Sequence, residues 1–184
     1  ALKFKEQDYF LKNTTLISNL PYNISIPLLI KWTYQLEKSP WYKKMILMFQ
    51  KEVAERILSK ENSKKFGRIT LLTSAFFKIT KIIDVNKSDF YPIPKVDSIV
   101  LLFEPLKKKM INFNEIKALE LLSHEFFNNR RKKLKKKITK LFDEEVIKKN
   151  SLDKLYDLRA ENLNKFTFYK LVKLVNSDHL QPKI

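Results

Sequence analysis

The four residues best suited to chemistry are Asn19, Leu20, Pro21 and Tyr22. They follow residues 14–18, an apolar and β-branched run that predicts a short buried strand. Ligands of α/β sheets bind beyond the carboxyl ends of strands, so a substrate could lie at this position. The amide oxygen of Asn19 and the carbonyl oxygen of Leu20 could accept both N–H groups of an aromatic amine. Accepting both would draw the nitrogen toward a pyramidal, more nucleophilic geometry.

Pro21 and Tyr22 complete this candidate site. Proline restricts the turn, so the two acceptors stay convergent. Tyr22 offers an aromatic face on which a base could stack, for about 1–3 kcal/mol. Such a base must be unpaired or flipped out of a duplex to reach the turn. The pattern therefore suits methylation of the exocyclic amine of adenine, although the same four residues taken alone also fit a simple turn.

A second chemically informative segment is the basic run at residues 130–137. Its charged members are Arg130, Arg131, Lys132, Lys133, Lys135, Lys136 and Lys137. An apolar stripe lies beside them, which predicts a basic helix: Phe127, Leu134, Ile138 and Leu141. Like charges at this density repel one another, so a polyphosphate partner explains them better than a solvated helix face. Such contacts would position a nucleic acid without reading its sequence.

The composition narrows the possible functions. The 184 residues carry 37 Lys and Arg against 20 Asp and Glu, a formal net charge of +17, which indicates an anionic partner. The alternative is compositional drift, because lysine, isoleucine, asparagine and phenylalanine are all plentiful. No cysteine is present, which excludes disulfides, thiolate metal sites and a cysteine nucleophile. His124 and His179 are the only histidines, so a histidine-rich metal site is excluded too, and neither is assigned a role.

The chain has no signature of membrane targeting. No apolar run approaches the roughly 18 residues that a membrane-spanning helix needs, and the first residues lack the apolar core of a signal peptide. We therefore expect a soluble, cytoplasmic protein that binds neither membrane nor metal. The chain does not begin with Met, which suggests that a further segment precedes it.

Strands and helices are predicted to alternate around the candidate site. β-branched and apolar runs predict strands at residues 14–18, 44–49, 78–85 and 98–103. Helices are predicted at residues 26–36, 51–58 and 69–77, with Pro27 in the first turn of the first one and Ser39-Pro40 at its end. This order indicates an α/β sheet in which 44–49 is central and the last two strands pair antiparallel. After Pro105 the apolar spacing is helical.

Six segments, in order along the chain, resemble the rRNA adenine N(6)-dimethyltransferase family. They are the catalytic turn (residues 19–25), a strand-to-helix junction (49–57), Phe66-Gly67-Arg68, a proline-rich loop (90–98), the basic segment (126–134) and Arg159-Ala160-Glu161-Asn162-Leu163. The resemblance implies an α/β fold, the C-terminal part of a class I (Rossmann-like) methyltransferase sheet followed by a small α-helical subdomain. Residues 1–107 would form the former and residues 108–184 the latter.

The resemblance also implies roles for single residues. Asn19 would contact both S-adenosylmethionine and the adenine amine, Leu20 would offer its carbonyl, and Tyr22 would stack on one face of the base. Phe90, in the proline-rich loop, is the candidate for the opposite face, with a packed loop anchor as the equal alternative. Lys51 and Glu52 would only begin a helix. The basic residues 130–133, 135 and 136 would contact rRNA.

The chain departs from the family at the cofactor site. Class I methyltransferases hold S-adenosylmethionine on a glycine-rich loop after their first strand, whereas Gly67 is the single glycine here. We therefore expect a fragment that lacks the first three strands and most cofactor contacts. The strand at 14–18 would then be an exposed sheet edge. We expect the isolated chain not to bind the cofactor productively and to aggregate.

The function that the resemblance implies is dimethylation of adenines in small-subunit rRNA within an immature ribosomal subunit, by a monomeric parent enzyme. One alternative is a large-subunit rRNA dimethyltransferase, although such relatives favour Ile in place of Leu20. A DNA adenine methyltransferase fits less well, because the C-terminal segments do not match. A non-catalytic RNA-binding relative is the alternative from another class, and intact Asn19 and Tyr22 argue against it.

Overall fold

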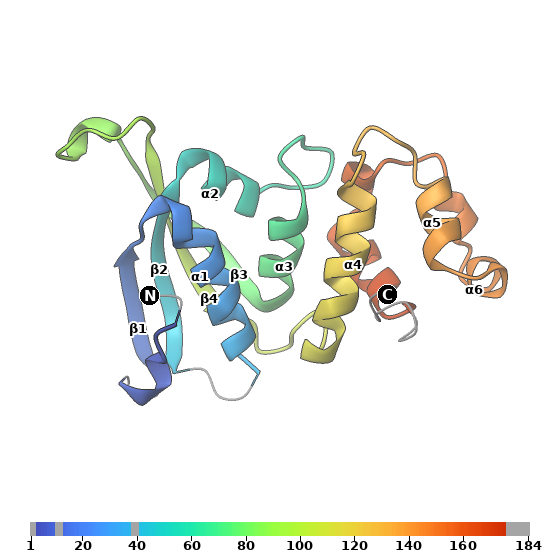
Figure 1. The fold of residues 1–184 in the computed structure, drawn as a ribbon, viewed down its shortest axis with the longest axis horizontal. Coiled ribbons are helices and arrows are strands. Elements are labelled where there is room, and N and C mark those ends of the chain that lie inside the picture. Colours follow the sequence, from blue (N-terminus) through green and yellow to red (C-terminus); the bar gives the residue numbers. More distant parts are fainter. Residues whose placement is uncertain (1–2, 10–12, 38–40, 176–184) are drawn as a thin grey trace. The chain divides into compact units, whose positions relative to one another are not determined.

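The computed structural model describes residues 3–9, 13–37 and 41–175, and contacts divide it into two compact units. Unit 1 comprises residues 1–58 and 76–109 and contains the sheet, whereas unit 2 comprises residues 59–75 and 110–184 and is helical (Figure 1). Residues 59–75 thus group with the C-terminal helices. The functional boundary between residues 107 and 108 stays a prediction.

Unit 1 is built on a four-stranded sheet in the order β1-β2-β4-β3. Its strands are β1 (Thr14–Asn19), β2 (Tyr42–Gln50), β3 (Phe77–Val85) and β4 (Ser98–Pro105). β1 and β2 are parallel, and β4 pairs antiparallel with both β2 and β3. All four predicted strands are confirmed, as is the antiparallel pairing of the last two. β2 lies between β1 and β4. Its apolar side chains are buried on both faces of the sheet, as the run of apolar residues predicted.

β1 lies at the edge of the sheet. Among the described residues it pairs with β2 alone, and its side chains alternate between half-buried and exposed. Ile17 is 71% exposed. The expectation that this strand is buried is wrong, since no strand covers its outer side within the described part of the chain, and the expected exposed edge is confirmed.

Two helices follow β1 and β2 in unit 1 (Figure 1). α1 (Tyr22–Gln35) begins directly after Pro21, and α2 (Lys51–Ile57) directly after β2. The helix predicted from residue 26 therefore starts earlier, and Pro27 lies inside it rather than in its first turn. Its predicted end at Ser39-Pro40 includes residues outside the described ranges.

The segment before β1 is tied to α1 by one carboxylate. Glu6, in the short 3₁₀ helix Glu6–Asp8, is 4% exposed. It accepts hydrogen bonds from Lys31 Nζ (2.8 Å), Trp32 Nε1 (2.8 Å) and Gln35 Nε2 (3.1 Å). Burial raises the pKa of Glu6, but these donors outweigh it and hold the pKa below its ordinary value.

Unit 2 is a set of short helices around an aromatic core. Its helices are α3 (Arg68–Phe76), α4 (Ile116–Phe127), α5 (Lys135–Leu141), α6 (Glu144–Lys149) and α7 (Lys165–Val172). Phe168 packs against Phe126 and Phe127, and Phe66 packs on Phe127 and Phe168, with ring centroids 5.7–6.2 Å apart. The hydroxyl of Tyr169 donates to the carbonyl oxygen of Leu71 at 2.9 Å.

The basic run is not one helix. α4 ends at Phe127 and α5 begins only at Lys135, so residues 128–134 form a turn. Asn129 has a φ of 52°, a left-handed conformation that interrupts a helix. Lys137 Nζ donates to the carbonyl oxygens of Phe126 and Asn128, both at 2.6 Å, and so satisfies the end of α4. The predicted continuous basic helix is therefore wrong.

Candidate active site and nucleic-acid interface

The Asn19–Tyr22 turn joins the carboxyl end of β1 to the first residue of α1. Asn19 is the last residue of β1, beside Met48 of β2, and its side chain is exposed. Leu20 is buried, and Pro21 is exposed with φ −55° and ψ 130°, which directs the chain into α1. The predicted position beyond a strand of the sheet is confirmed.

Tyr22 is held from two sides. Its hydroxyl group lies 2.9 Å from Oγ of Ser98, the fully buried first residue of β4. Its carbonyl oxygen accepts a hydrogen bond of 3.0 Å from Ser25 Oγ within α1. Two rotatable bonds orient the ring, and the hydrogen bond at its far end restricts both. The half-buried ring therefore sits in a defined orientation at the start of α1.

The turn and the proline-rich loop line one cavity of about 330 Å³. The lining residues are Asn19, Leu20, Pro21, Tyr22, Phe90, Tyr91, Pro92 and Pro94. This volume is at the lower end of the range of ligand pockets. Five residues predicted for catalysis thus lie around one space, and Phe90 is half-buried there. Whether Phe90 stacks on a base or only anchors the loop stays a prediction.

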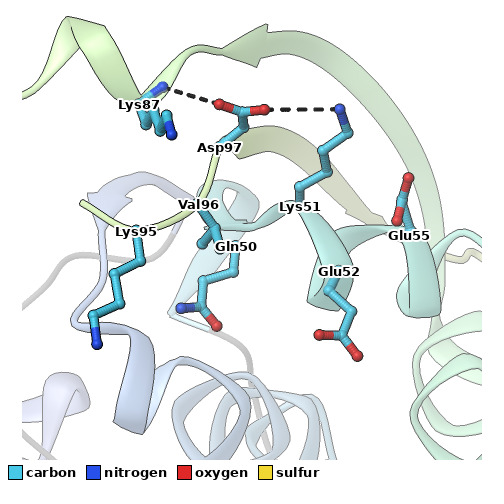
Figure 2. Close-up of a pocket in the computed structure, with 8 residues that line it drawn as sticks. All are labelled: Gln50, Lys51, Glu52, Glu55, Lys87, Lys95, Val96 and Asp97. Atoms are coloured by element: carbon cyan, nitrogen blue, oxygen red, sulfur yellow. Dashed lines mark hydrogen bonds and ion pairs between the residues drawn. The ribbon is translucent and has the colours of Figure 1, made fainter. Parts of the chain in front are cut away.

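Asp97 braces the proline-rich loop at its base (Figure 2). The backbone N–H of Lys87 donates to Asp97 Oδ1 at 3.1 Å, and the N–H of Lys51 donates to the Asp97 carbonyl oxygen at 2.9 Å. Lys51 Nζ lies 3.9 Å from Asp97 Oδ2. The two ends of the loop are therefore joined to each other and to the start of α2. Lys51 and Glu52 are the first two residues of this helix, as predicted.

In unit 2, Arg130 connects three segments that are distant in the sequence. Its Nε donates to Glu161 Oε2 at 2.7 Å. Its terminal nitrogen donates to the carbonyl oxygens of Ser63 (3.1 Å) and Phe66 (2.8 Å), and its guanidinium lies 5.7 Å from the Phe127 ring centroid. The first arginine of the basic run is thus hydrogen-bonded within unit 2.

The other predicted RNA-binding residues differ in their partners. Lys133 pairs with Asp157 at 2.7 Å, and this hydrogen bond lowers the pKa of the Asp157 carboxyl. Lys135 Nζ lies 5.7 Å from the Tyr156 ring centroid. Arg131, Lys132 and Lys136 are exposed. These last three are the members of the run best placed to meet a polyanion.

Sequence reasoning did not single out Ser98, Tyr91 or the Arg130–Glu161 pair. Ser98 and Tyr91 belong to the proline-rich segment that carried the resemblance, so their positions were visible but their contacts were not. Of the two histidines, His124 is exposed in the last turn of α4, and His179 lies outside the described residues.

The sequence model of the family described as Ribosomal RNA adenine dimethylase matches residues 2–177. The chain belongs to the ribosomal RNA adenine dimethylase family. A relative in Pelagibacter ubique, named Ribosomal RNA small subunit methyltransferase A, is 40% identical, and the match covers 94% of the chain and 65% of the relative. A relative of the same name in Borreliella burgdorferi is 36% identical over 89% of the chain and 56% of the relative. The chain therefore spans less than two thirds of these relatives' length.

Two solved structures support the same fold. A dimethyladenosine transferase from Plasmodium falciparum aligns with a TM-score of 0.74 and 28% identity, covering 93% of the chain and 68% of that protein. The 23S rRNA methyltransferase ErmE aligns with a TM-score of 0.62 and 15% identity over 89% of the chain and 66% of that protein, a likeness of fold alone. The predicted Rossmann-like methyltransferase fold is confirmed.

The family uses S-adenosylmethionine, and which residues of this chain would contact it stays a prediction. Asn19 and Leu20 line the cavity, whereas Gly67, the single glycine, precedes α3 in unit 2. Within the described ranges, no helix is long and apolar enough to cross a membrane. No cluster of three or more metal-ligating side chains was found in those same ranges.

Proposed function

We propose that this chain forms the adenine-binding side of an enzyme that dimethylates adenines in small-subunit ribosomal RNA, with S-adenosylmethionine as the methyl donor. The observation that carries this proposal is the cavity in which the Asn19–Tyr22 turn meets Phe90 in a member of this family. The names of the relatives support the small subunit as the source of the substrate. We expect the substrate to be an immature ribosomal subunit in the cytoplasm. We expect the enzyme to be a monomer.

In this proposal the turn activates the adenine amine by hydrogen bonding. Asn19 Oδ1 and the carbonyl oxygen of Leu20 accept the two N–H groups, which opposes delocalisation of the lone pair into the ring. Secondary structure fixes the backbone that carries both acceptors, because Asn19 ends β1 and Tyr22 begins α1. The amine is therefore aimed before reaction, and orientation lowers the barrier.

Two aromatic rings would hold the base. Tyr22 would cover one face, with its ring fixed by the hydrogen bond to Ser98. Phe90 would cover the other face from the proline-rich loop. A base inserted between them has left its own strand's stack, and the two rings replace the stacking that it gave up.

The methyl donor would approach from the side of β1. S-adenosylmethionine, when bound, supplies an electrophilic methyl group. Asn19 is the described residue that we propose touches both donor and acceptor, because it ends the edge strand β1 and lines the cavity. That the 184 residues alone do not bind this cofactor productively stays a prediction.

The basic run would hold ribosomal RNA by its phosphates. Arg131, Lys132 and Lys136 are exposed, and we propose that they make direct contacts. Lys133 and Lys135 already interact with Asp157 and Tyr156, so they would contribute mainly through their charge. Arg130 would act by fixing the start of the run on Glu161.

One experiment tests the proposal. The full-length protein is given a labelled methyl donor and immature small ribosomal subunits, and the methylated base is mapped. We expect label on the exocyclic nitrogen of adenines in small-subunit RNA. Label in large-subunit RNA or in DNA would overturn the proposal, and so would the absence of any label.

A further inference from the structure

The loop between β3 and β4 presents apolar side chains to solvent, and one of them, Tyr91, lines the candidate active site. Tyr91 is 100% exposed, Ile93 66% and Val96 40%. Apolar groups that gather on a surface mark interaction sites more often than scattered ones do. Tyr91 also lines the cavity that contains Tyr22 and Phe90. A ligand of Tyr91 would therefore lie beside whatever occupies this cavity.

Tyr91 and Phe90 both line the cavity but differ in exposure. Phe90 has extended geometry, with φ −117° and ψ 150°. Successive side chains of an extended segment point to opposite sides. Phe90 is accordingly half-buried and Tyr91 fully exposed. Tyr91 is thus poorly placed to hold the base that Tyr22 and Phe90 enclose, but well placed to meet its neighbour along the strand.

The base of the loop is fixed, which favours a role in positioning. Asp97 accepts a hydrogen bond from the Lys87 N–H (Figure 2), and its carbonyl oxygen accepts one from the Lys51 N–H. A side chain on a braced loop loses less conformational entropy on binding than one on a free loop. Lys95, on the same loop, is exposed and extends away from Asp97 in Figure 2.

We propose that Tyr91 stacks on the nucleotide next to the target adenine and sets the register of the RNA strand. This inference rests on the proposed function. Stacking tolerates any base, because every base has a π-face. Tyr91 therefore selects for an unpaired neighbour rather than for a particular sequence, and the lysines of its loop favour the anionic strand.

The test measures the RNA affinity of protein variants in the absence of methyl donor. The full-length protein and its Tyr91→Ala and Tyr91→Phe variants are titrated with a single-stranded small-subunit RNA fragment that contains the target adenine. Matched RNAs lack the base on one side of that adenine or on the other. Tyr91→Ala should weaken binding about five- to hundredfold, the range expected when one base no longer stacks on an aromatic ring, and Tyr91→Phe should bind as the wild type does.

Removing the stacked neighbour base should weaken the wild type by a similar factor and leave Tyr91→Ala unaffected. The salt dependence should stay the same in all variants, because the ring carries no charge. Tyr9→Ala is the matched control, since Tyr9 is a 72% exposed tyrosine of the same unit that lies outside the cavity.

Three outcomes would overturn the inference. They are wild-type affinity of Tyr91→Ala for the RNA fragment, a loss of affinity that does not depend on either neighbouring base, and, when the same variants are titrated with assembled subunits, a loss of affinity seen only there, which would indicate a protein partner. Failure of the proposed function is distinguishable, because it would show as no methyl transfer by the wild-type protein whatever its affinity for RNA.

Discussion

The hydroxyl group of Tyr22 lies 2.9 Å from Oγ of Ser98, a residue 76 positions further along the chain. Tyr22 begins α1, and Ser98 begins β4 where the proline-rich loop ends. This hydrogen bond therefore joins the two segments that line the candidate site. Because Ser98 is fully buried, its oxygen has no access to water as an alternative partner.

Removing this bond should slow methyl transfer without unfolding the protein. Ser98→Ala and Tyr22→Phe should each lower the single-turnover rate about fivefold, corresponding to a hydrogen bond of about 1 kcal/mol. The double variant should be no slower than either single variant, because both remove the same interaction. Ser123→Ala, which removes a buried serine hydroxyl in α4, is the control. Strictly additive effects of the two substitutions would show that the two residues act independently.

Arg130 should matter for stability more than its exposed neighbour does. Arg130→Ala removes charge-assisted hydrogen bonds to Glu161, Ser63 and Phe66, and should lower the free energy of unfolding by about 2–3 kcal/mol. Arg130→Lys should stay destabilised, since an ammonium group cannot reproduce the planar fork. Arg131→Ala should change stability by less than about 0.5 kcal/mol. Equal unfolding curves for the two alanine variants would contradict this role.

The exposed basic residues should set the salt dependence of RNA binding. In the Arg131→Ala, Lys132→Ala, Lys136→Ala triple variant, the slope of log affinity against log salt should fall by about 0.7–0.9 for each phosphate that is no longer neutralised. The control is a triple alanine variant of Lys149, Lys170 and Lys173, which removes the same charge from exposed positions elsewhere in unit 2. The same slope in both triple variants would argue against a specific RNA-binding face.

Glu6 should make stability depend on pH in the acid range. Its pKa in the folded state lies below the unfolded value because Lys31, Trp32 and Gln35 donate to the carboxylate. Its contribution to the free energy of unfolding is therefore complete above about pH 4.5, the ordinary pKa of a glutamate. The contribution is lost as the pH falls through the pKa of the folded state. We expect Glu6→Gln to lose about 2 kcal/mol of unfolding free energy at pH 6.

The destabilisation should be smaller at pH 3, because below the ordinary pKa the unfolded wild-type chain binds a proton at Glu6 more readily than the folded chain does, which lowers the wild-type stability. Denaturant unfolding at both pH values measures the difference, with Glu145→Gln, an exposed position in α6, as the control. A gap between Glu6→Gln and the wild type that is as large at pH 3 as at pH 6 would exclude an ionised Glu6 as its source.

Local patterns predicted the sheet and the turn well. β2 was recognisable because a run of apolar residues suits a strand covered on both faces. The turn was recognisable because Pro21 and the preceding strand fix its position. The cavity also brings in Phe90, which the ordered resemblance had suggested and spacing alone would not have.

Contacts between distant residues could not be predicted. The basic run looks uniform in sequence, but its members have different partners. Arg130 donates hydrogen bonds to Ser63, Phe66 and Glu161. Lys137 donates to a carbonyl oxygen at the end of α4. The number of charges in a segment carries no information about which cation meets a carbonyl oxygen. The break between α4 and α5 also depends on one residue, Asn129. The spacing of apolar residues does not predict its left-handed conformation.

The most direct measurement is the amount of dimethyladenosine in small-subunit RNA after incubation with the full-length protein, compared with its Asn19→Ala variant. Mass spectrometry of digested RNA measures the modified base. We predict dimethyladenosine with the wild type and a rate at least about a hundredfold lower with Asn19→Ala, since this change removes an acceptor aimed at the reacting amine. Wild-type activity of Asn19→Ala would contradict the central claim that the Asn19–Tyr22 turn performs the chemistry.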